Sequence, residues 1–233
     1  MLPKVSKNII VIIPAHNEEE AIGKVIEEIP QDWVREIVVV NNRSTDQTAA
    51  VAQAAGATVV YEPLPAYGQA CLCGINYVKT HTKPPDIVVF LDGDHSDYPQ
   101  QLPDLVRPIL DQDYDMVIGS RALGERERGS MTPPQVFGNW LATRLLKWIY
   151  GVQYTDLGPF RAIKWDKLLA LDMQDTTYGW TVEMQLKAAK LGYRTTEVAV
   201  HYRKRIGFSK ISGTVKGVIL AGYKIITTIF KYR

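Results

Sequence analysis

The first half of the chain alternates short apolar runs with segments of helical periodicity. The runs are rich in Val and Ile without polar interruptions, as strands buried on both faces of a sheet are. Strand and helix repeat roughly every 25 residues, which is typical of βαβ units in a mostly parallel sheet. The sequence therefore predicts an α/β fold with helices on both faces. The predicted strands are 8–15, 35–42, 57–62, 86–92 and 115–120, and the predicted helices are 18–29, 44–56, 67–81 and 99–112.

Two of these helices have local signals at their ends. The helix at 18–29 has acidic residues in its expected first turn, where the helix dipole favours them. In the helix at 44–56, Ser44 and Gln47 have capping-box spacing and Gly56 is a stop signal.

The pattern changes after residue 121. Residues 122–135 are polar with a Pro-Pro pair, which predicts a long loop of the kind that is often functional. An aromatic-rich helix at 136–151, a helix within 177–192 and an alternating strand at 195–203 follow. The last segment places apolar residues on one helical face and lysines off it, so it predicts a basic amphipathic helix. We divide the chain into a domain of residues 1–210 and this helix, residues 211–233. The apolar face consists of Val215, Val218, Ile219, Gly222, Ile225, Ile226 and Ile229.

Length, cysteines and hydropathy exclude several classes of protein. The chain has 233 residues, enough for one sizeable domain. Its two cysteines, Cys71 and Cys73, support neither a disulfide framework nor a zinc site, which favours a reducing cytoplasm. No run reaches the roughly 18 apolar residues of a membrane span, and the run at 9–13 is too short for a signal peptide. We expect a protein that is soluble or peripheral on the cytosolic face of a membrane.

Charge is unevenly distributed along the chain. Eight of the 27 basic residues and none of the 25 acidic residues follow Glu197, so the C-terminal segment is basic and the remainder is acidic. Such a segment is expected to face an anionic partner. Its apolar stripe argues against nucleic acid and favours a membrane interface, where exposed aromatic residues of the helix at 136–151 would also sit. The alternative is that both helices pack on the sheet or form a contact in a homo-oligomer.

Three carboxylates follow the fourth predicted strand, in the stretch DGDHSD. Ligands bind beyond the carboxyl ends of strands in open α/β sheets, and Asp92 and Asp94 lie there with Gly93 between them. Two hard oxygen donors one residue apart suit Mg²⁺ or Mn²⁺, and a cation would also offset their mutual repulsion. Spacing alone leaves a second interpretation open, in which the carboxylates, Asp97 included, cap the next helix or are solvated in a turn. Polar loops after the first two strands, PAHNEE and NNRSTDQT, extend the polar edge and favour the binding site.

In order along the chain, the segments VIIPAHNEEE, VVVNNRSTDQT, YGQA, FLDGDHSDYP and VIGSR resemble a family-2 glycosyltransferase with a GT-A fold. The later DLGPFRA and RIGFSK are similar to the dolichyl-phosphate mannose synthase-like and polyprenyl-phosphate glucosyltransferase group. The resemblance covers roughly residues 9–210 and implies an inverting hexosyltransferase that uses a nucleotide-diphospho sugar, UDP-glucose or GDP-mannose, with Mg²⁺ or Mn²⁺. It implies that Asp92 and Asp94 serve the diphosphate through the cation, with Ser96 as a further ligand. It also implies nucleotide-sugar contacts from Pro14, Ala15, Asn17, Glu18, Asn42, Asp92 and Gly93.

The nature of the acceptor decides which further residues matter. A polyprenyl or dolichyl phosphate is already anionic and requires cations rather than a base, and guanidinium groups suit bidentate phosphate contacts. The basic stretch YRKRIGFSK supplies these groups, with Arg121 from VIGSR beside it; the expected contacts are Arg121, Arg205, Ser209 and Lys210. A hydroxyl acceptor would need a base, and Glu183 is the candidate. Asp156 is expected to order the loop beside the acceptor, and His95 is a further candidate metal ligand.

Two other functions remain as alternatives to these transferases. A sugar nucleotidyltransferase would share the sheet and the carboxylates, but PAHNEE replaces its Gly-rich, Arg-containing phosphate loop. A catalytically silent domain of the same fold, acting as a binding module on a membrane surface, would bind no nucleotide in the presence of Mn²⁺.

Overall fold

The computed structural model describes residues 8–80, 83–207 and 215–232. Seven strands of this part form one sheet in the order β3-β2-β1-β4-β6-β5-β7. Only β6 runs antiparallel to its neighbours, β4 and β5, and the other pairs are parallel. The predicted α/β class is therefore confirmed. The strands are β1 (Ile9–Ala15), β2 (Glu36–Asn41), β3 (Thr58–Tyr61), β4 (Ile87–Phe90), β5 (Met116–Ser120), β6 (Arg161–Lys164) and β7 (Thr195–Ala199).

Helices cover both faces of the sheet, because alternate strand residues point to opposite sides and both sets are apolar. One core lies under α3, α5, α6, α7 and α8, and the other lies under α1, α2 and α4. None of the described helices has the length and apolar content of a membrane span. The helices are α1 (Ile22–Glu28), α2 (Thr48–Ala54), α3 (Tyr67–Lys79), α4 (Leu102–Gln112), α5 (Pro133–Tyr150), α6 (Trp165–Ala170), α7 (Trp180–Lys190) and α8 (Val215–Lys231), with a 3₁₀ turn at Pro99–Gln101.

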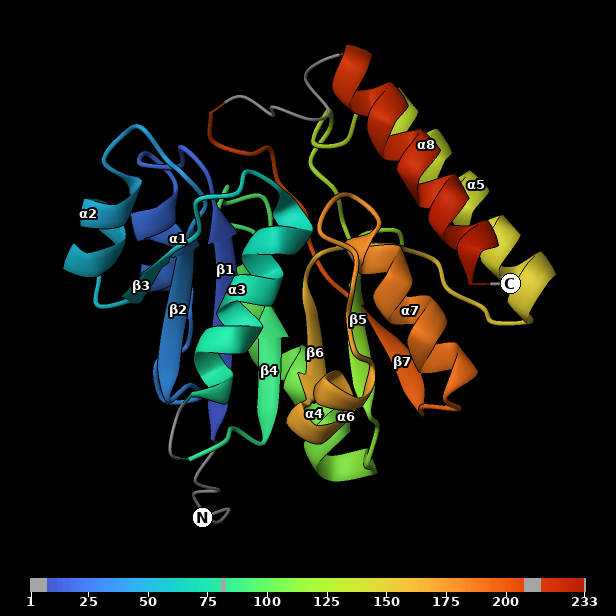
Figure 1. Ribbon diagram of the computed structural model, residues 1–233, viewed down its shortest axis with the longest axis horizontal. Coiled ribbons are helices and arrows are strands. Elements are labelled where there is room, and N and C mark those ends of the chain that lie inside the picture. The colour runs from blue at the N-terminus through green and yellow to red at the C-terminus, as the bar shows by residue number, and fades with distance from the viewer. Residues whose placement is uncertain (1–7, 81–82, 208–214, 233) are drawn as a thin grey trace.

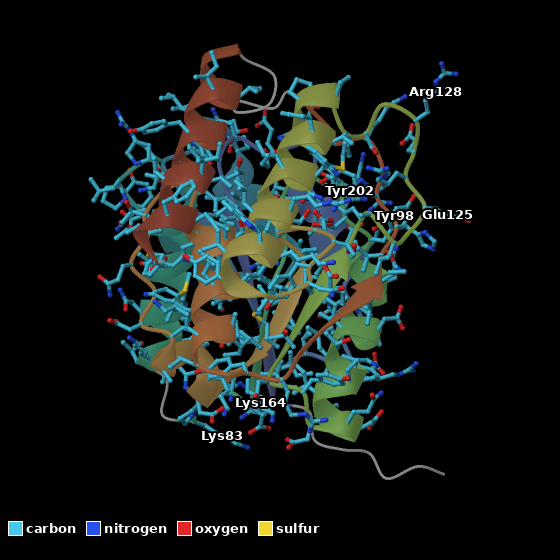
Figure 2. The ribbon with its side chains drawn as sticks, turned by 90° about the vertical axis from the view of Figure 1, so that its right-hand side faces the viewer. Lys83, Tyr98, Glu125, Arg128, Lys164 and Tyr202 are labelled. Atoms are coloured by element: carbon cyan, nitrogen blue, oxygen red, sulfur yellow. The ribbon has the colours of Figure 1, made fainter. Side chains whose placement is uncertain are left out.

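The C-terminal helix packs on the protein. Figure 1 shows α8 lying along α5, and α8 also contacts α7. Ile229 and Thr228 are buried, whereas Ile219, which the sequence placed on the same apolar face as Ile229, is largely exposed. Several apolar side chains on the outer sides of α5 and α8 are exposed. This side of the molecule faces the viewer in Figure 2.

Several sequence-based predictions about elements are wrong. Strand β6 and helix α6 were not predicted. The four residues of β6 carry a charge at each end and show no strand periodicity. Helix α1 begins at Ile22, so the acidic residues expected in its first turn precede it. Helix α2 begins at Thr48, and Gln47 makes no side-chain cap. Ser44 forms no capping box, because its hydroxyl accepts a hydrogen bond from the Asn17 amide at 3.0 Å.

Candidate active site

A crevice of about 270 Å³ opens beyond the carboxyl ends of β1, β2 and β4. It lies where parallel strands present their C-terminal loops at one edge of the sheet. The structure brings most of the predicted donor-site residues together here, with Tyr67, Tyr178 and Arg205 in addition. The predicted residues that line the crevice are Pro14, Ala15, Glu18, Asn42, Asp92, Gly93 and Asp94.

Asp92 and Asp94 form a carboxylate pair on the crevice wall. Asp92 accepts a hydrogen bond from the Tyr67 hydroxyl at 3.1 Å. Burial, and then the charge of Asp94, raise the pKa of Asp92 to about 7. Asp94 is buried, and one of its oxygens accepts a hydrogen bond from the Ser96 amide at 2.9 Å. Two carboxylates held this close favour the binding of a cation.

The carboxylate pair fits a divalent metal ion. The described residues contain no group of three or more His, Cys, Asp or Glu side chains arranged to hold a metal. Two carboxylates that open onto a crevice nevertheless match the way Mg²⁺ binds, through one or two carboxylates with phosphate oxygens and water completing the shell. Asp92 and Asp94 are the residues that would hold the ion.

Three neighbouring residues do not face the crevice as a ligand would. Ser96 was expected as a ligand, but it is buried behind Asp94 and its hydroxyl donates to that carboxylate. His95 points to α1, where its ring lies 3.0 Å from the Glu28 carboxylate. Asp97 is buried, and neither of its carboxylate oxygens finds a hydrogen-bond partner in the described part of the chain. Burial, and then the charge of Asp92, raise the pKa of Asp97 well above its usual range.

Asn17 and Asn42 both organise loops around the crevice. The side-chain oxygen of Asn17 accepts the Thr45 amide at 2.7 Å, which joins the loop after β1 to the loop after β2, and Asn17 does not line the crevice. The buried Asn42 amide group donates to the Leu64 carbonyl at 2.7 Å, and its oxygen accepts the Ala66 amide at 3.0 Å. Asn42 therefore shapes the crevice wall at residues 62–66, with its side chain engaged by the protein.

Arg205 lies between two cavities. Its guanidinium contacts the Glu18 carboxylate at 2.7 Å and the Asp94 carboxylate at 3.1 Å. Gly207 follows with a φ of 75°, a conformation that favours glycine. Ser209 and Lys210, which the sequence assigned to the acceptor phosphate, lie outside the described residues.

A second groove of about 320 Å³ shares Asp92, Asp94 and Arg205 with the crevice and runs between α5 and α8. Arg121 lines its polar end and is held by Asp156 through contacts at 2.7 and 2.8 Å. Burial alone would raise the pKa of Asp156, but Arg121 keeps it below its usual value. Asp156 thus orders the loop after β5. The apolar part of the lining is Met131, Pro134, Leu157, Tyr202, Val218, Ala221 and Ile225.

Glu183 is not brought to the crevice or the groove. Its side chain is fully buried in α7 and accepts hydrogen bonds from the amides of Gln174 and Asp175 at 3.0 and 2.7 Å. Neither cavity is lined by it. The prediction of Glu183 as the base for a hydroxyl acceptor is therefore corrected: its burial and hydrogen bonds leave no path to a substrate proton.

Sequence reasoning missed Tyr67, Tyr178, Tyr202 and Arg161. Tyr67 begins YGQA, a segment that contributes to the family resemblance but for which the sequence predicted no site role, and Tyr178 lies in the loop before α7. Tyr202 lies in the basic stretch that was read only for its cations. Figure 2 shows Tyr202 inward of the loop from which Arg128 extends, and its ring stacks under Arg121 at 5.1 Å. The sequence offers a signal at Tyr202, which directly precedes the charged residues Arg203, Lys204 and Arg205.

The chain belongs to glycosyl transferase family 2, whose sequence pattern matches residues 10–168. It is 36% identical over 214 residues to an uncharacterized glycosyltransferase of Mycobacterium tuberculosis, covering 91% of this chain and 93% of that protein. It is 28% identical to the undecaprenyl-phosphate mannosyltransferase of Micrococcus luteus, covering 90% of this chain and 89% of that protein.

The fold is that of the GT-A glycosyltransferases. The crystal structure of glucosyl-3-phosphoglycerate synthase from Mycobacterium tuberculosis, in complex with Mn²⁺, UDP and phosphoglyceric acid, superimposes with a TM-score of 0.76. The match covers 98% of this chain and 79% of that chain at 24% identity, so it supports the fold alone. The GT-A fold predicted from the sequence is confirmed.

Proposed function

We propose that this chain is an inverting hexosyltransferase that moves a sugar from UDP-glucose or GDP-mannose to a polyprenyl or dolichyl phosphate. The observation that carries the proposal is the wall that the crevice and the groove share, formed by Asp92, Asp94 and Arg205. A sugar held at this wall has its leaving diphosphate on one side and an attacking group on the other. Inversion at C1 requires this opposed arrangement, and holding both reactants in it supplies much of the rate enhancement.

The second groove supports a lipid phosphate as the acceptor. Its polar end carries two guanidinium groups, Arg121 and Arg205, which suit a phosphate. Its far wall is apolar and comes from α5 and α8, which suits a hydrocarbon chain. A phosphate monoester is already ionised near neutral pH and attacks without a base, which agrees with the position of Glu183 away from the groove. The name of the Micrococcus luteus relative points in the same direction.

The chain's own residues orient the reactants and balance charge. Asp92 and Asp94 would hold Mg²⁺ or Mn²⁺, and the bound ion would neutralise the charge that develops on the leaving diphosphate. Tyr67 fixes Asp92 and Ser96 fixes Asp94, so the carboxylates are preorganised. Arg205 stands between the donor and the acceptor and offsets the negative charge of both.

The outer face of α5 and α8 supports binding to an anionic membrane surface. Large apolar side chains are exposed there, with Trp148 at 80% and Tyr223 at 68% exposure. Neither helix contains an Asp or Glu, whereas Arg144, Lys147 and Lys231 are among their basic residues. A two-fold contact between copies through this face would oppose like charges, so the charge pattern favours a membrane over a homo-oligomer. The groove between the same helices would then open toward its lipid.

A transfer assay tests the catalytic proposal. The purified chain is incubated with Mn²⁺, labelled UDP-glucose or GDP-mannose, and undecaprenyl phosphate in detergent, and labelled lipid is extracted. We expect the label to move to the lipid from one donor. Transfer only to a hydroxyl acceptor would refute the lipid-phosphate assignment. Absence of UDP and GDP binding with Mn²⁺ in calorimetry would instead favour the silent binding module.

Vesicle flotation tests the membrane face. The chain is expected to float with phosphatidylglycerol vesicles more than with phosphatidylcholine vesicles, and less at high salt. Leu220→Ala on α8 should reduce flotation, whereas Leu191→Ala should not, because Leu191 is similarly exposed but lies beyond the end of α7. Equal flotation of both variants would remove this face from membrane binding.

A further inference from the structure

The segment between α6 and α7, residues 171–179, connects the donor crevice to the C-terminal helix. Tyr178 near its end lines the crevice. The Thr176 carbonyl accepts the Gln69 amide at 2.8 Å in the first turn of α3. The two backbones approach so closely that a Cβ atom on Gly68 would lie 2.2 Å from the Asp175 carbonyl oxygen. The segment therefore rests directly on the helix turn whose Tyr67 binds Asp92.

Glu183 holds this segment from the other side. Its carboxylate accepts the amides of Gln174 and Asp175, and it also accepts the hydroxyl of Tyr232 at 2.5 Å. Lys187 completes the set with an ion pair at 2.8 Å. A buried carboxylate is stable only with such partners. One side chain thus joins the crevice segment to the end of the C-terminal helix.

A second contact ties the same two parts together. Lys224 on α8 pairs with the Asp175 carboxylate at 2.9 Å. Burial alone would raise the pKa of Asp175, but the hydrogen bonds from Lys224 and Thr177 lower it below its ordinary value. Since α8 lines the groove and Tyr178 lines the crevice, these contacts span the distance between the two cavities.

We propose that Glu183 is a positioning residue, which sets Tyr178 at the donor crevice and α8 at the acceptor groove in one fixed arrangement. The inference rests on the proposed transferase function, because it assigns the two cavities to the two substrates. It gives the buried acid in α7 a role in substrate binding and none in proton transfer. Binding at either cavity is then sensitive to contacts made at the far end of α8.

Steady-state kinetics of the full chain with Mn²⁺, the active sugar nucleotide and undecaprenyl phosphate test the inference. The variants are Glu183→Gln, Tyr232→Phe and Lys224→Met. We expect the KM of both substrates to rise roughly fivefold or more, the lower range of typical coupling between sites. The pH profile of kcat should stay as in the wild type. If Glu183 were a general base, Glu183→Gln would instead lower kcat about 10²- to 10⁴-fold, and Tyr232→Phe would leave kcat and KM unchanged.

Tyr193→Phe is the matched control. Its hydroxyl donates to the Lys167 carbonyl at 3.0 Å, so the variant also loses one tyrosine hydrogen bond near α7. This hydrogen bond does not involve Glu183 or residues 171–179. Its KM values should equal those of the wild type. Wild-type KM values in Tyr232→Phe and Lys224→Met would overturn the inference, even if Glu183→Gln fails to fold.

The inference and the proposed function fail in different ways. A wild-type chain that binds a nucleotide with Mn²⁺ but transfers no sugar to the lipid contradicts the proposed function. In that case the Kd of the nucleotide with Mn²⁺ replaces KM, and it should still rise in Tyr232→Phe. An active wild type whose variants keep their KM values, or a nucleotide Kd unchanged in Tyr232→Phe, contradicts the positioning role.

Discussion

The carboxylate pair after β4 should destabilise the metal-free protein, and Asp92→Asn tests this. The surroundings raise the pKa of Asp92 from 3.8 to about 7, by burial first and the charge of Asp94 second. The unfolded chain therefore releases this proton near pH 4 and the folded chain near pH 7. The folded state binds more protons between these values, so its stability should fall as the pH rises through this window.

The size of the effect follows from the width of this window. A pKa that is higher by one in the folded state than in the unfolded state corresponds to about 1.4 kcal/mol, so the whole window is worth at most about 4 kcal/mol. The part of the window above pH 5 sets an upper limit of about 3 kcal/mol for the interval from pH 5 to pH 8. Asp92 keeps some solvent exposure, so we expect about half of this limit.

Urea unfolding in EDTA at pH 5 and pH 8 measures the effect. An asparagine side chain carries no charge but keeps an oxygen that can accept the Tyr67 hydroxyl, so Asp92→Asn removes the charge with little change of shape. The variant should gain stability relative to the wild type on going from pH 5 to pH 8. Added Mn²⁺ should stabilise the wild type more than the variant.

Two results would refute this reasoning. A stability difference between Asp92→Asn and the wild type that is the same at both pH values would show that Asp92 does not titrate in this window. A variant that becomes relatively less stable at pH 8 would show that the ionised carboxylate is favourable in the folded protein without a metal.

Three further substitutions follow from the same site. Asp94→Ala should abolish transfer and metal-dependent donor binding; circular dichroism would check the fold, and wild-type turnover would contradict the assignment. Arg205→Ala should raise the Kd of both the donor and the acceptor roughly tenfold or more in calorimetry, because the proposed position of its guanidinium is between them. An unchanged Kd for both would exclude a role of Arg205 in substrate binding. Arg121→Met should cost about 3–5 kcal/mol in urea unfolding, because the buried Asp156 carboxylate loses its cationic partner, and adding Asp156→Asn should recover part of the loss.

The sheet was predictable where each strand carries its own signal. The runs at β1, β2 and β4 are apolar on both faces, and such runs have few alternatives to a buried parallel strand. The strand β6 has no such signal, because its four residues begin with Arg161 and end with Lys164. Its position is decided by β4 and β5, which bond it from both sides, so only the assembled sheet identifies it.

The candidate site was likewise predictable only in part. Asp92 and Asp94 follow a strand directly, so topology alone brings them to the sheet edge. The sequence could not tell which way Ser96 and Glu183 face, because a hydroxyl or a carboxylate can serve a ligand or the protein's own amides. The structure gives both to the protein, where they hold Asp94 and residues 174–175.

The buried Arg161 shows why the surroundings of such a site escape sequence reasoning. Desolvation lowers its pKa to about 10, and its guanidinium donates to the carbonyls of Leu157, Gly158 and Thr181. An unpaired carbonyl is costly in a protein interior, so one rigid donor that serves three carbonyls can offset the burial of a charge. Leu157 and Thr181 line the second groove, from a loop and from α7. Arg161 therefore fixes that wall from behind, a role that depends on carbonyl positions and leaves no pattern in the sequence.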